Sequence, residues 1–239
     1  LIFPACGIIF LILFLKNRIK KASGVSLIFK ALTSVCFMGQ AFCGVWKAAA
    51  DSDISAGFPL LILAGLFSGL LGDIWLDLKW NCPAENDLYT FAGFFSFAAG
   101  HVLFIAGLIC GFCKGAGIMW VVLPLILAVI LGVIVGMNGK IMHLDYGRFK
   151  HVTMLYSALL TGTMLLSGSL LIRSGLKNGA LWTFFAGAVL FLISDLILSG
   201  TYFGNGKDRP SDIISNHVFY YAAQFLIAGS VLAYTGDIL

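Results

Sequence analysis

The stretch GLFSGLLGDIWLDL, residues 65–78, is apolar enough to cross a lipid bilayer, yet it carries an aspartate, Asp73, within it. Similar apolar stretches recur along the chain, whose 239 residues are 60% hydrophobic and only 11% charged. So few polar side chains cannot cover the surface of a soluble domain of this length. The runs are long and lack the alternation of a membrane β-strand, so the backbone must satisfy its hydrogen bonds within helices. We therefore predict an all-α, multi-pass membrane protein.

Eight apolar runs, separated by polar loops, have about the length of 20 residues that a membrane-spanning helix needs. They cover residues 1–15, 27–45, 58–78, 91–110, 119–137, 152–172, 181–198 and 213–233. The first run ends in the basic stretch KNRIKK rather than in a cleavage site of small residues, so it is predicted as a span and not as a signal peptide. We expect one polytopic bundle of eight transmembrane helices over residues 1–239, in which Pro124 only kinks the fifth helix.

The basic residues are unevenly divided between the two sides of this bundle. Ten of them flank the odd-numbered loops, four flank the even-numbered loops, and Lys30 lies within a span. Because cytoplasmic loops carry an excess of Lys and Arg, we predict odd loops in the cytoplasm, termini outside and a location in the cell membrane. The ten are Lys16, Arg18, Lys20, Lys21, Lys79, Lys140, Arg148, Lys150, Lys207 and Arg209, and the four are Lys47, Lys114, Arg173 and Lys177.

An internal repeat relates the opening stretch to GAVLFLISDLIL, residues 187–198, at an offset of 122 residues. The offset aligns Asp73 with Asp195 and Gly65 with Gly187, and it superimposes the IAG triplet at 105–107 on the one at 227–229. Four spans separate the copies, and an even number preserves orientation. We therefore predict two parallel four-helix repeats, residues 1–117 and 118–239, that bring both aspartates to equal depth beside a shared axis.

Several polar residues accompany the aspartates inside the spans. On the eighth span, Asn216, Tyr220 and Gln224 follow a four-residue spacing, with His217 and Tyr221 one step round, which predicts a polar stripe facing inward. Lys30, Asn216 and His217 are expected in one layer with both aspartates, about five residues (roughly 7 Å) from the cytoplasmic helix ends. His101 and Gln224 are expected near mid-membrane. Ser68 and Ser194 lie beside the acids and suit both helix packing and a binding site.

These residues have structural readings as well as functional ones. Asp73 alone would suit an ion pair with Lys30, and His101 would suit a satisfied core histidine. Two acids at matched positions, beside a polar stripe, favour a functional pocket instead. The six cysteines lie mostly in apolar segments without disulfide spacing, and the CxxC of Cys110 and Cys113 lacks further metal ligands. No cofactor or metal is expected, and no nucleic-acid partner either, since the net charge of +4 comes from basic loop residues that fit the inner-leaflet bias.

Three fragments, FSGLLGD around Asp73, FLISD around Asp195 and HVFYYAAQFLIAG from His217, resemble the YhhN-type lysoplasmalogenase family of eight-helix membrane proteins. The resemblance runs from the second span to the eighth. It implies hydrolysis of the alkenyl (vinyl) ether bond of lysoplasmalogens, releasing a fatty aldehyde and glycerophosphoethanolamine or glycerophosphocholine. Two positions depart from the family pattern: Phe104 stands where a tyrosine is frequent, and Ala31 where a proline is frequent.

This reaction needs an acid to protonate the β-carbon and a base to orient water onto the resulting oxocarbenium ion. Two carboxyl groups in one sheltered site can divide these roles, as they do in glycoside cleavage. The hypothesis makes Asp195 the acid and Asp73 the base, with water and a lysophospholipid among membrane lipids as the reactants. The expected substrate-binding residues are Lys30, Ser68, His101, Ser194, Asn216, His217, Tyr220, Tyr221 and Gln224.

Two rival functions stay open on the sequence. A proton-coupled transporter of a small amphiphile also uses parallel repeats and buried acids, although its acids are more often at mid-membrane. A zinc lipid hydrolase would need His101, His217 and an aspartate to meet, which their different depths disfavour.

Overall fold

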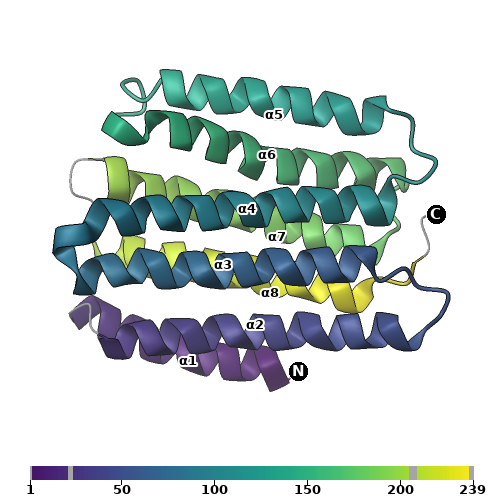
Figure 1. Ribbon diagram of the computed structural model, residues 1–239, viewed down its shortest axis with the longest axis horizontal. Helices are drawn as coiled ribbons and strands as arrows, with labels where there is room; N and C mark the ends of the chain where they lie inside the picture. Colours follow the sequence, from purple (N-terminus) through teal and green to yellow (C-terminus); the bar gives the residue numbers. More distant parts are fainter. Residues whose placement is uncertain (1, 21–23, 205–208, 237–239) are drawn as a thin grey trace.

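A computed structural model of the chain describes residues 2–20, 24–204 and 209–236. The described residues form eight long helices that run back and forth side by side (Figure 1), with two short 3-10 turns, Pro83–Glu85 and Gly147–Phe149, and no strand among them. The helices are α1 Ile2–Lys20, α2 Gly24–Ala50, α3 Gly57–Asn81, α4 Asn86–Phe112, α5 Met119–Met137, α6 Lys150–Arg173, α7 Gly179–Phe203 and α8 Pro210–Ala233. The predicted all-helical bundle of eight helices is confirmed.

Seven of these helices, α1 to α7, are long and apolar enough to span a membrane, by length and composition. The exception, α8, has 24 residues and lies within the bundle, but its polar stripe lowers its hydropathy. Asn216, Tyr220, Tyr221 and Gln224 are all buried, so these polar groups are turned away from the lipid. The chain is thus a multi-pass membrane protein whose least apolar helix is shielded by its neighbours.

The helices extend beyond the apolar runs at most ends. The fifth helix has the predicted bounds, with Pro124 inside it. In contrast, α7 runs from Gly179 to Phe203. Its start is capped by Asn178, whose side chain accepts a hydrogen bond from the Leu181 N–H at 3.0 Å. Asp73 and Asp195 therefore lie eight residues before the ends of α3 and α7. At 1.5 Å per residue this is roughly 12 Å, deeper than the predicted 7 Å.

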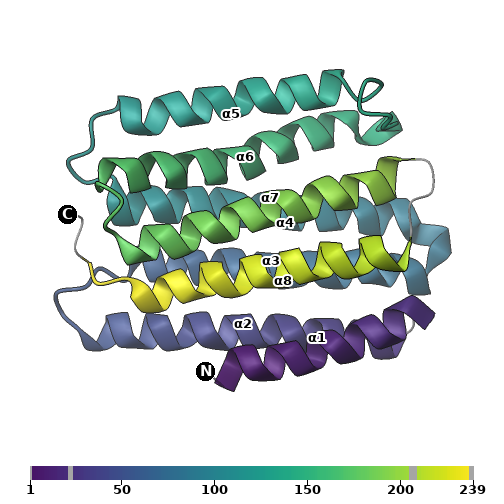
Figure 2. The same ribbon diagram turned by 180° about the vertical axis from the view of Figure 1, so that it is seen from behind.

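The helix contacts follow a two-fold pattern. Helices α1 and α2, α3 and α4, α5 and α6, and α7 and α8 pack as neighbours; α2 also contacts α3 and α8, and α6 contacts α7 and α4. Exchanging α1–α4 with α5–α8 maps each of these contacts onto another of the set. Seen from behind (Figure 2), α7 and α8 cross in front of α4 and α3. This arrangement supports the predicted pair of parallel repeats.

Glycines bring the central helices close together at matching places. A Cβ on Gly65 of α3 would lie 2.5 Å from the Phe104 ring and 3.0 Å from the Gly100 carbonyl oxygen of α4. A Cβ on Gly187 of α7 would lie 2.9 Å from the Ala223 carbonyl oxygen of α8. The two glycines that the repeat aligns are thus both points of close approach between the backbones of a central pair.

Basic residues gather at the end where α1, α3, α5 and α7 finish, which we name the basic end. The described ones there are Lys16, Arg18, Lys20, Lys79, Lys140, Arg148, Lys150 and Arg209. The opposite end holds Lys47, Lys114, Arg173 and Lys177. Lys21 and Lys207, which also enter the predicted asymmetry, lie outside the described residues. The bundle therefore carries the charge difference along its axis that the sequence predicts.

Candidate active site

A cavity opens among the helices toward the basic end, and both aspartates line it. Its free volume of about 70 Å³ has room for a few water molecules. Asp73 comes from α3 and Asp195 from α7. Of the predicted binding residues, the cavity is lined by Lys30, Ser194, Asn216, His217 and Tyr220. Side chains from distant parts of the sequence therefore meet around one cavity that is large enough for water.

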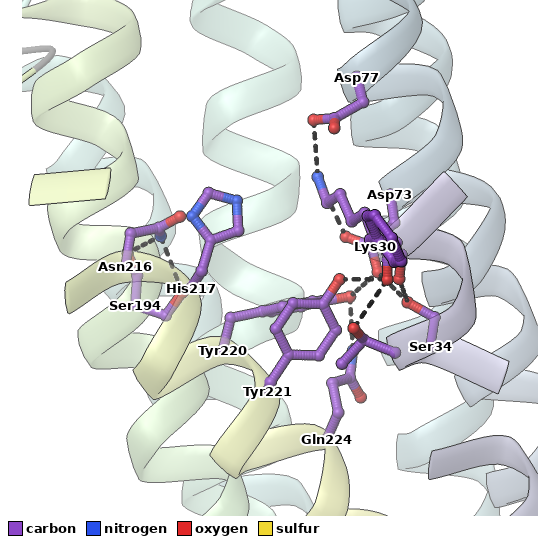
Figure 3. Close-up of polar contacts among 12 residues, drawn as sticks. Lys30, Ser34, Asp73, Asp77, Ser194, Asn216, His217, Tyr220, Tyr221 and Gln224 are labelled. Atoms are coloured by element: carbon purple, nitrogen blue, oxygen red, sulfur yellow. Dashed lines mark hydrogen bonds and ion pairs between the residues drawn. The ribbon is translucent and has the colours of Figure 1, made fainter. Parts of the chain in front are cut away.

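Lys30 of α2 joins two carboxylates of α3 in a buried ion cluster (Figure 3). Its Nζ lies 3.5 Å from Asp73 Oδ1 and 3.0 Å from Asp77 Oδ1, and all three side chains are less than 8% exposed. Asp73 and Asp77 are four residues apart, so they share one face of α3. The ion pair between Lys30 and Asp73 that the structural interpretation expects is thus present, and Asp77 is a second partner of Lys30.

Hydroxyl groups from α2 and α8 form hydrogen bonds with Asp73. Its Oδ2 accepts hydrogen bonds from Ser34 Oγ at 2.8 Å and from the Tyr220 hydroxyl at 2.9 Å. Gln224 Nε2 donates in turn to the Tyr220 oxygen at 2.9 Å, and the Tyr221 hydroxyl donates to the Lys30 carbonyl at 3.2 Å. Figure 3 shows these α8 side chains reaching toward α2 and α3. Tyr220, Tyr221 and Gln224 of the α8 stripe therefore hold Asp73 and the neighbouring backbone of α2 in place.

Asp195 has a simpler environment. Its Oδ2 accepts a hydrogen bond from the Tyr156 hydroxyl of α6, and within the described part of the chain no basic side chain pairs with it. This bond and the Ser34–Asp73 bond both span 39 residues, and their partners are separated by the repeat offset of 122. The two repeats thus supply a hydroxyl donor at the same place, a serine in one and a tyrosine in the other.

The neighbouring residues of α7 and α8 also join across the cavity. Asn216 Nδ2 donates to the Ser194 carbonyl at 2.8 Å and to Ser194 Oγ at 3.0 Å, as the left part of Figure 3 shows. His217 Nδ1 lies 2.8 Å from the Ile213 carbonyl oxygen of its own helix, and its ring packs on Phe14. These contacts fix the side of α8 that faces the cavity.

Four of the predicted binding residues do not line the cavity. Tyr221 and Gln224 reach it only through the bonds described above. Ser68 Oγ donates to the Ser96 carbonyl at 2.7 Å and joins α3 to α4. His101 Nδ1 lies 3.1 Å from Thr163 Oγ1 and its ring packs against Phe191, but its buried Nε2 has no hydrogen-bond partner among the described residues.

The zinc site of the rival hypothesis requires His101 and His217 to meet. His217 lines the cavity and His101 does not. Among the described residues, no group of three or more His, Cys, Asp or Glu side chains is placed to hold a metal ion. The three ligands of that hypothesis are therefore not brought together.

Four residues of the site carry no signal of their own in the sequence. Ser34 and Tyr156 are single hydroxyls within apolar runs, and Asp77 reads as the charged end of its span. Arg18 reads as part of the basic run after the first span, yet it lines the cavity and its guanidinium lies 4.3 Å from the centre of the Trp80 ring. The one sequence feature that could have indicated them is the equal spacing of Ser34 from Asp73 and of Tyr156 from Asp195.

Comparison with known proteins adds the family. No curated protein and no solved structure matches the chain. The YhhN family matches it over residues 25–231, a range that holds both aspartates, the α8 stripe and the two hydroxyl donors. With the match extending from α2 to α8, the chain belongs to the YhhN family.

Proposed function

We propose that the protein is a membrane-embedded hydrolase that cleaves the alkenyl ether bond of lysoplasmalogens. The observation that carries the proposal is the single cavity lined by Asp73 and Asp195, with room for water, about two helical turns from the basic end. An ether bond just below a lipid head group would lie at a similar depth. Membership of the YhhN family is consistent with a hydrolase.

The reaction proceeds by proton transfers that two carboxyl groups can divide. An acid gives a proton to the β-carbon of the alkenyl ether, and the electron pair of the double bond forms the new C–H bond, leaving an oxocarbenium ion. Water adds to this ion and loses a proton to a base, giving a hemiacetal. The hemiacetal collapses to an aldehyde and a free glycerol hydroxyl. General acid–base catalysis contributes typically 10² to 10⁴-fold, so orientation must supply the rest.

The surroundings of the two carboxyl groups favour distinct roles. Lys30 balances the negative charge of Asp73, which suits Asp73 to orient and deprotonate water. Asp195 has the Tyr156 hydroxyl but, among the described side chains, no cation paired with it, and an unpaired charge at this depth is expensive. We therefore assign the proton donor to Asp195.

The head group needs a cation, and Arg18 suits this role better than Lys30. Lys30 was expected to contact the phosphate, but its ammonium is already engaged by two carboxylates. Arg18 lines the mouth of the cavity, half-buried, and a guanidinium binds phosphate through two parallel hydrogen bonds. In the cell membrane, with the basic end in the cytoplasm, the substrate would enter from the inner leaflet.

The test is aldehyde release by purified protein in detergent, with alkenyl and acyl lysolipids compared side by side. The wild-type protein should release aldehyde from the alkenyl lipid only. Asp73→Asn and Asp195→Asn should each lose roughly a hundredfold or more in rate. Asp51→Asn, at an exposed position on the opposite end, is the matched control and should keep full activity. Full activity in either site variant would sink the two-acid mechanism, and an intact alkenyl lipid with wild-type protein would favour the transporter.

A further inference from the structure

A second cavity lies on the far side of Asp195, between α5, α6 and α7. Its free volume is about 90 Å³. Apolar side chains from all three helices and from the α5–α6 connection dominate its wall, among them Val135, Met142, Leu160, Leu192, Leu196 and Phe203. In contrast to the first cavity, its lining includes no Lys or Arg among the described residues.

The two cavities share a wall. Asp195 and its partner Tyr156 line both, as do Phe94, Leu198 and Tyr202. The carboxyl group therefore stands where a polar, water-sized space meets an apolar one. A molecule that spans this boundary would present to Asp195 the bond at which its polar part joins its apolar part.

The second cavity also has a way out to the lipid. Helices α5 and α7 both pack on α6 but make little or no contact with each other. At the cavity wall, Leu196 on α7 is 54% exposed and Met142 is 40% exposed. Leu196 belongs to a face that, in a membrane-spanning bundle, contacts the hydrocarbon of the bilayer, while Met142 stands on the α5–α6 connection at the basic end.

We propose that this second cavity takes the first carbons of the alkenyl chain, which enters from the bilayer between α5 and α7. The inference rests on the proposed function and adds to it how the substrate is oriented. The polar head occupies the first cavity, the ether bond lies at Asp195, and the cavity encloses only the carbons nearest that bond. The rest of the chain stays in the lipid, so total chain length has little effect on rate.

In the described part of the first repeat, the groove on the corresponding helices does not include the aspartate, and this supplies a matched control. The corresponding groove of α1–α3 is lined by Val35, Met38, Gly39 and Leu63, but Asp73 is not part of it. Lys30 and Asp77, which close off Asp73, stand where the second repeat has Val152 and Ser199 at the offset of 122. The ion cluster thus separates Asp73 from the lipid, whereas Asp195 is reached from it.

Two substitutions at equivalent positions test the route. Leu196→Trp fills the mouth of the second cavity, and Ile74→Trp, 122 residues earlier, adds the same ring to α3 outside every cavity described here. Each is assayed with a long-chain lysoplasmalogen and with the two-carbon vinyl ether of glycerophosphoethanolamine. Leu196→Trp should lower kcat/KM for the long chain roughly tenfold or more and spare the two-carbon substrate. Ile74→Trp should match the wild type with both, and equal rates in both variants would overturn the proposal.

A binding measurement keeps this inference separate from the proposed activity. A lysolipid with a stable alkyl ether and a diazirine within the first carbons of its chain is photolysed with the wild-type protein and with Asp195→Asn. Label on Leu192, Leu196 or Leu160 supports the cavity even if no aldehyde is ever released. Label on Val35 or Leu63, or label spread without preference over the lipid face, overturns it even if the enzyme is active.

Discussion

At the scale of single residues, the two aspartates occupy matching positions but differ in what surrounds them. Asp73 has four polar neighbours on two helices: a lysine and a serine of α2, and a tyrosine and, through that tyrosine, a glutamine of α8. Among the described residues, Asp195 has one hydrogen-bonded polar neighbour, Tyr156. A duplicated position has thus acquired two chemical environments, which is what a reaction needing both an acid and a base requires.

This difference predicts unequal effects of removing the two matched hydroxyls. Tyr156→Phe removes the hydroxyl that would stabilise the carboxylate formed when Asp195 gives up its proton, and should lower kcat for aldehyde release roughly ten- to a hundredfold, because a hydrogen bond to a charged group is worth ~1.5–3 kcal/mol. Ser34→Ala should have a much smaller effect, since Tyr220 and Lys30 still hold Asp73. Initial rates over a range of substrate concentrations measure both.

The separation of kcat from KM is the control for this pair. Phenylalanine keeps the ring that lines the cavities, so KM and thermal stability of Tyr156→Phe should stay close to wild type while kcat falls. A larger kcat loss for Ser34→Ala than for Tyr156→Phe would reverse the assignment of acid and base.

At the scale of elements, sequence periodicity predicted more than apolar run length did. The count of eight helices followed from the apolar runs and the inward stripe of α8 from the four-residue spacing of its polar residues, and both are present. The ends were less accurate, because caps and polar turns lengthen a helix without adding apolar residues, as Asn178 does for α7. Asp77 was read as an exit residue for the same reason: its apolar run ended there, while α3 continues to Asn81.

The partners of the site could not be read from the sequence in the same way. A single serine or tyrosine in an apolar helix looks the same whether it bonds its own backbone or another helix. Thr161 bonds the Ser157 carbonyl four residues earlier, while Tyr156 bonds Asp195 across to α7. Which of these occurs depends on the rotation of each helix against its neighbours, and packing decides that.

The close approach of α7 and α8 gives a prediction at this scale. Gly187→Ala should destabilise the protein by ~1–3 kcal/mol, because the new Cβ would lie 2.9 Å from the Ala223 carbonyl oxygen, a backbone atom that cannot turn away. Gly200→Ala, on the same helix with nothing within 4 Å of its Cβ, is the matched control and should gain up to about 1 kcal/mol. Thermal unfolding in one detergent compares them, and equal midpoints would contradict the packing.

At the scale of the whole molecule, the two halves share a plan and differ in use. The main contacts among helices exchange under the repeat, and so do Ser34 with Tyr156 and Gly65 with Gly187. The ion cluster exists only in the first half, and the lipid-facing cavity beside the aspartate only in the second, among the described residues. The first half therefore supplies the buried ion cluster, and the second half supplies the cavity through which an apolar chain would reach Asp195.

The same axis sets the orientation in the membrane. The cavity opens toward the basic end, so the proposed function places the head group of the substrate in the cytoplasmic leaflet. In a chain whose six native cysteines are replaced, Ile141→Cys at the basic end should react with an impermeant maleimide only after cells are permeabilised; this side chain is 77% exposed. Asp53→Cys, exposed at the opposite end, should react in intact cells. The reverse pattern would leave the bundle and its cavity unchanged but would turn the cavity toward lipid of the outer leaflet. The excess of lysine and arginine would then mark the outer face, against the bias that orients membrane helices.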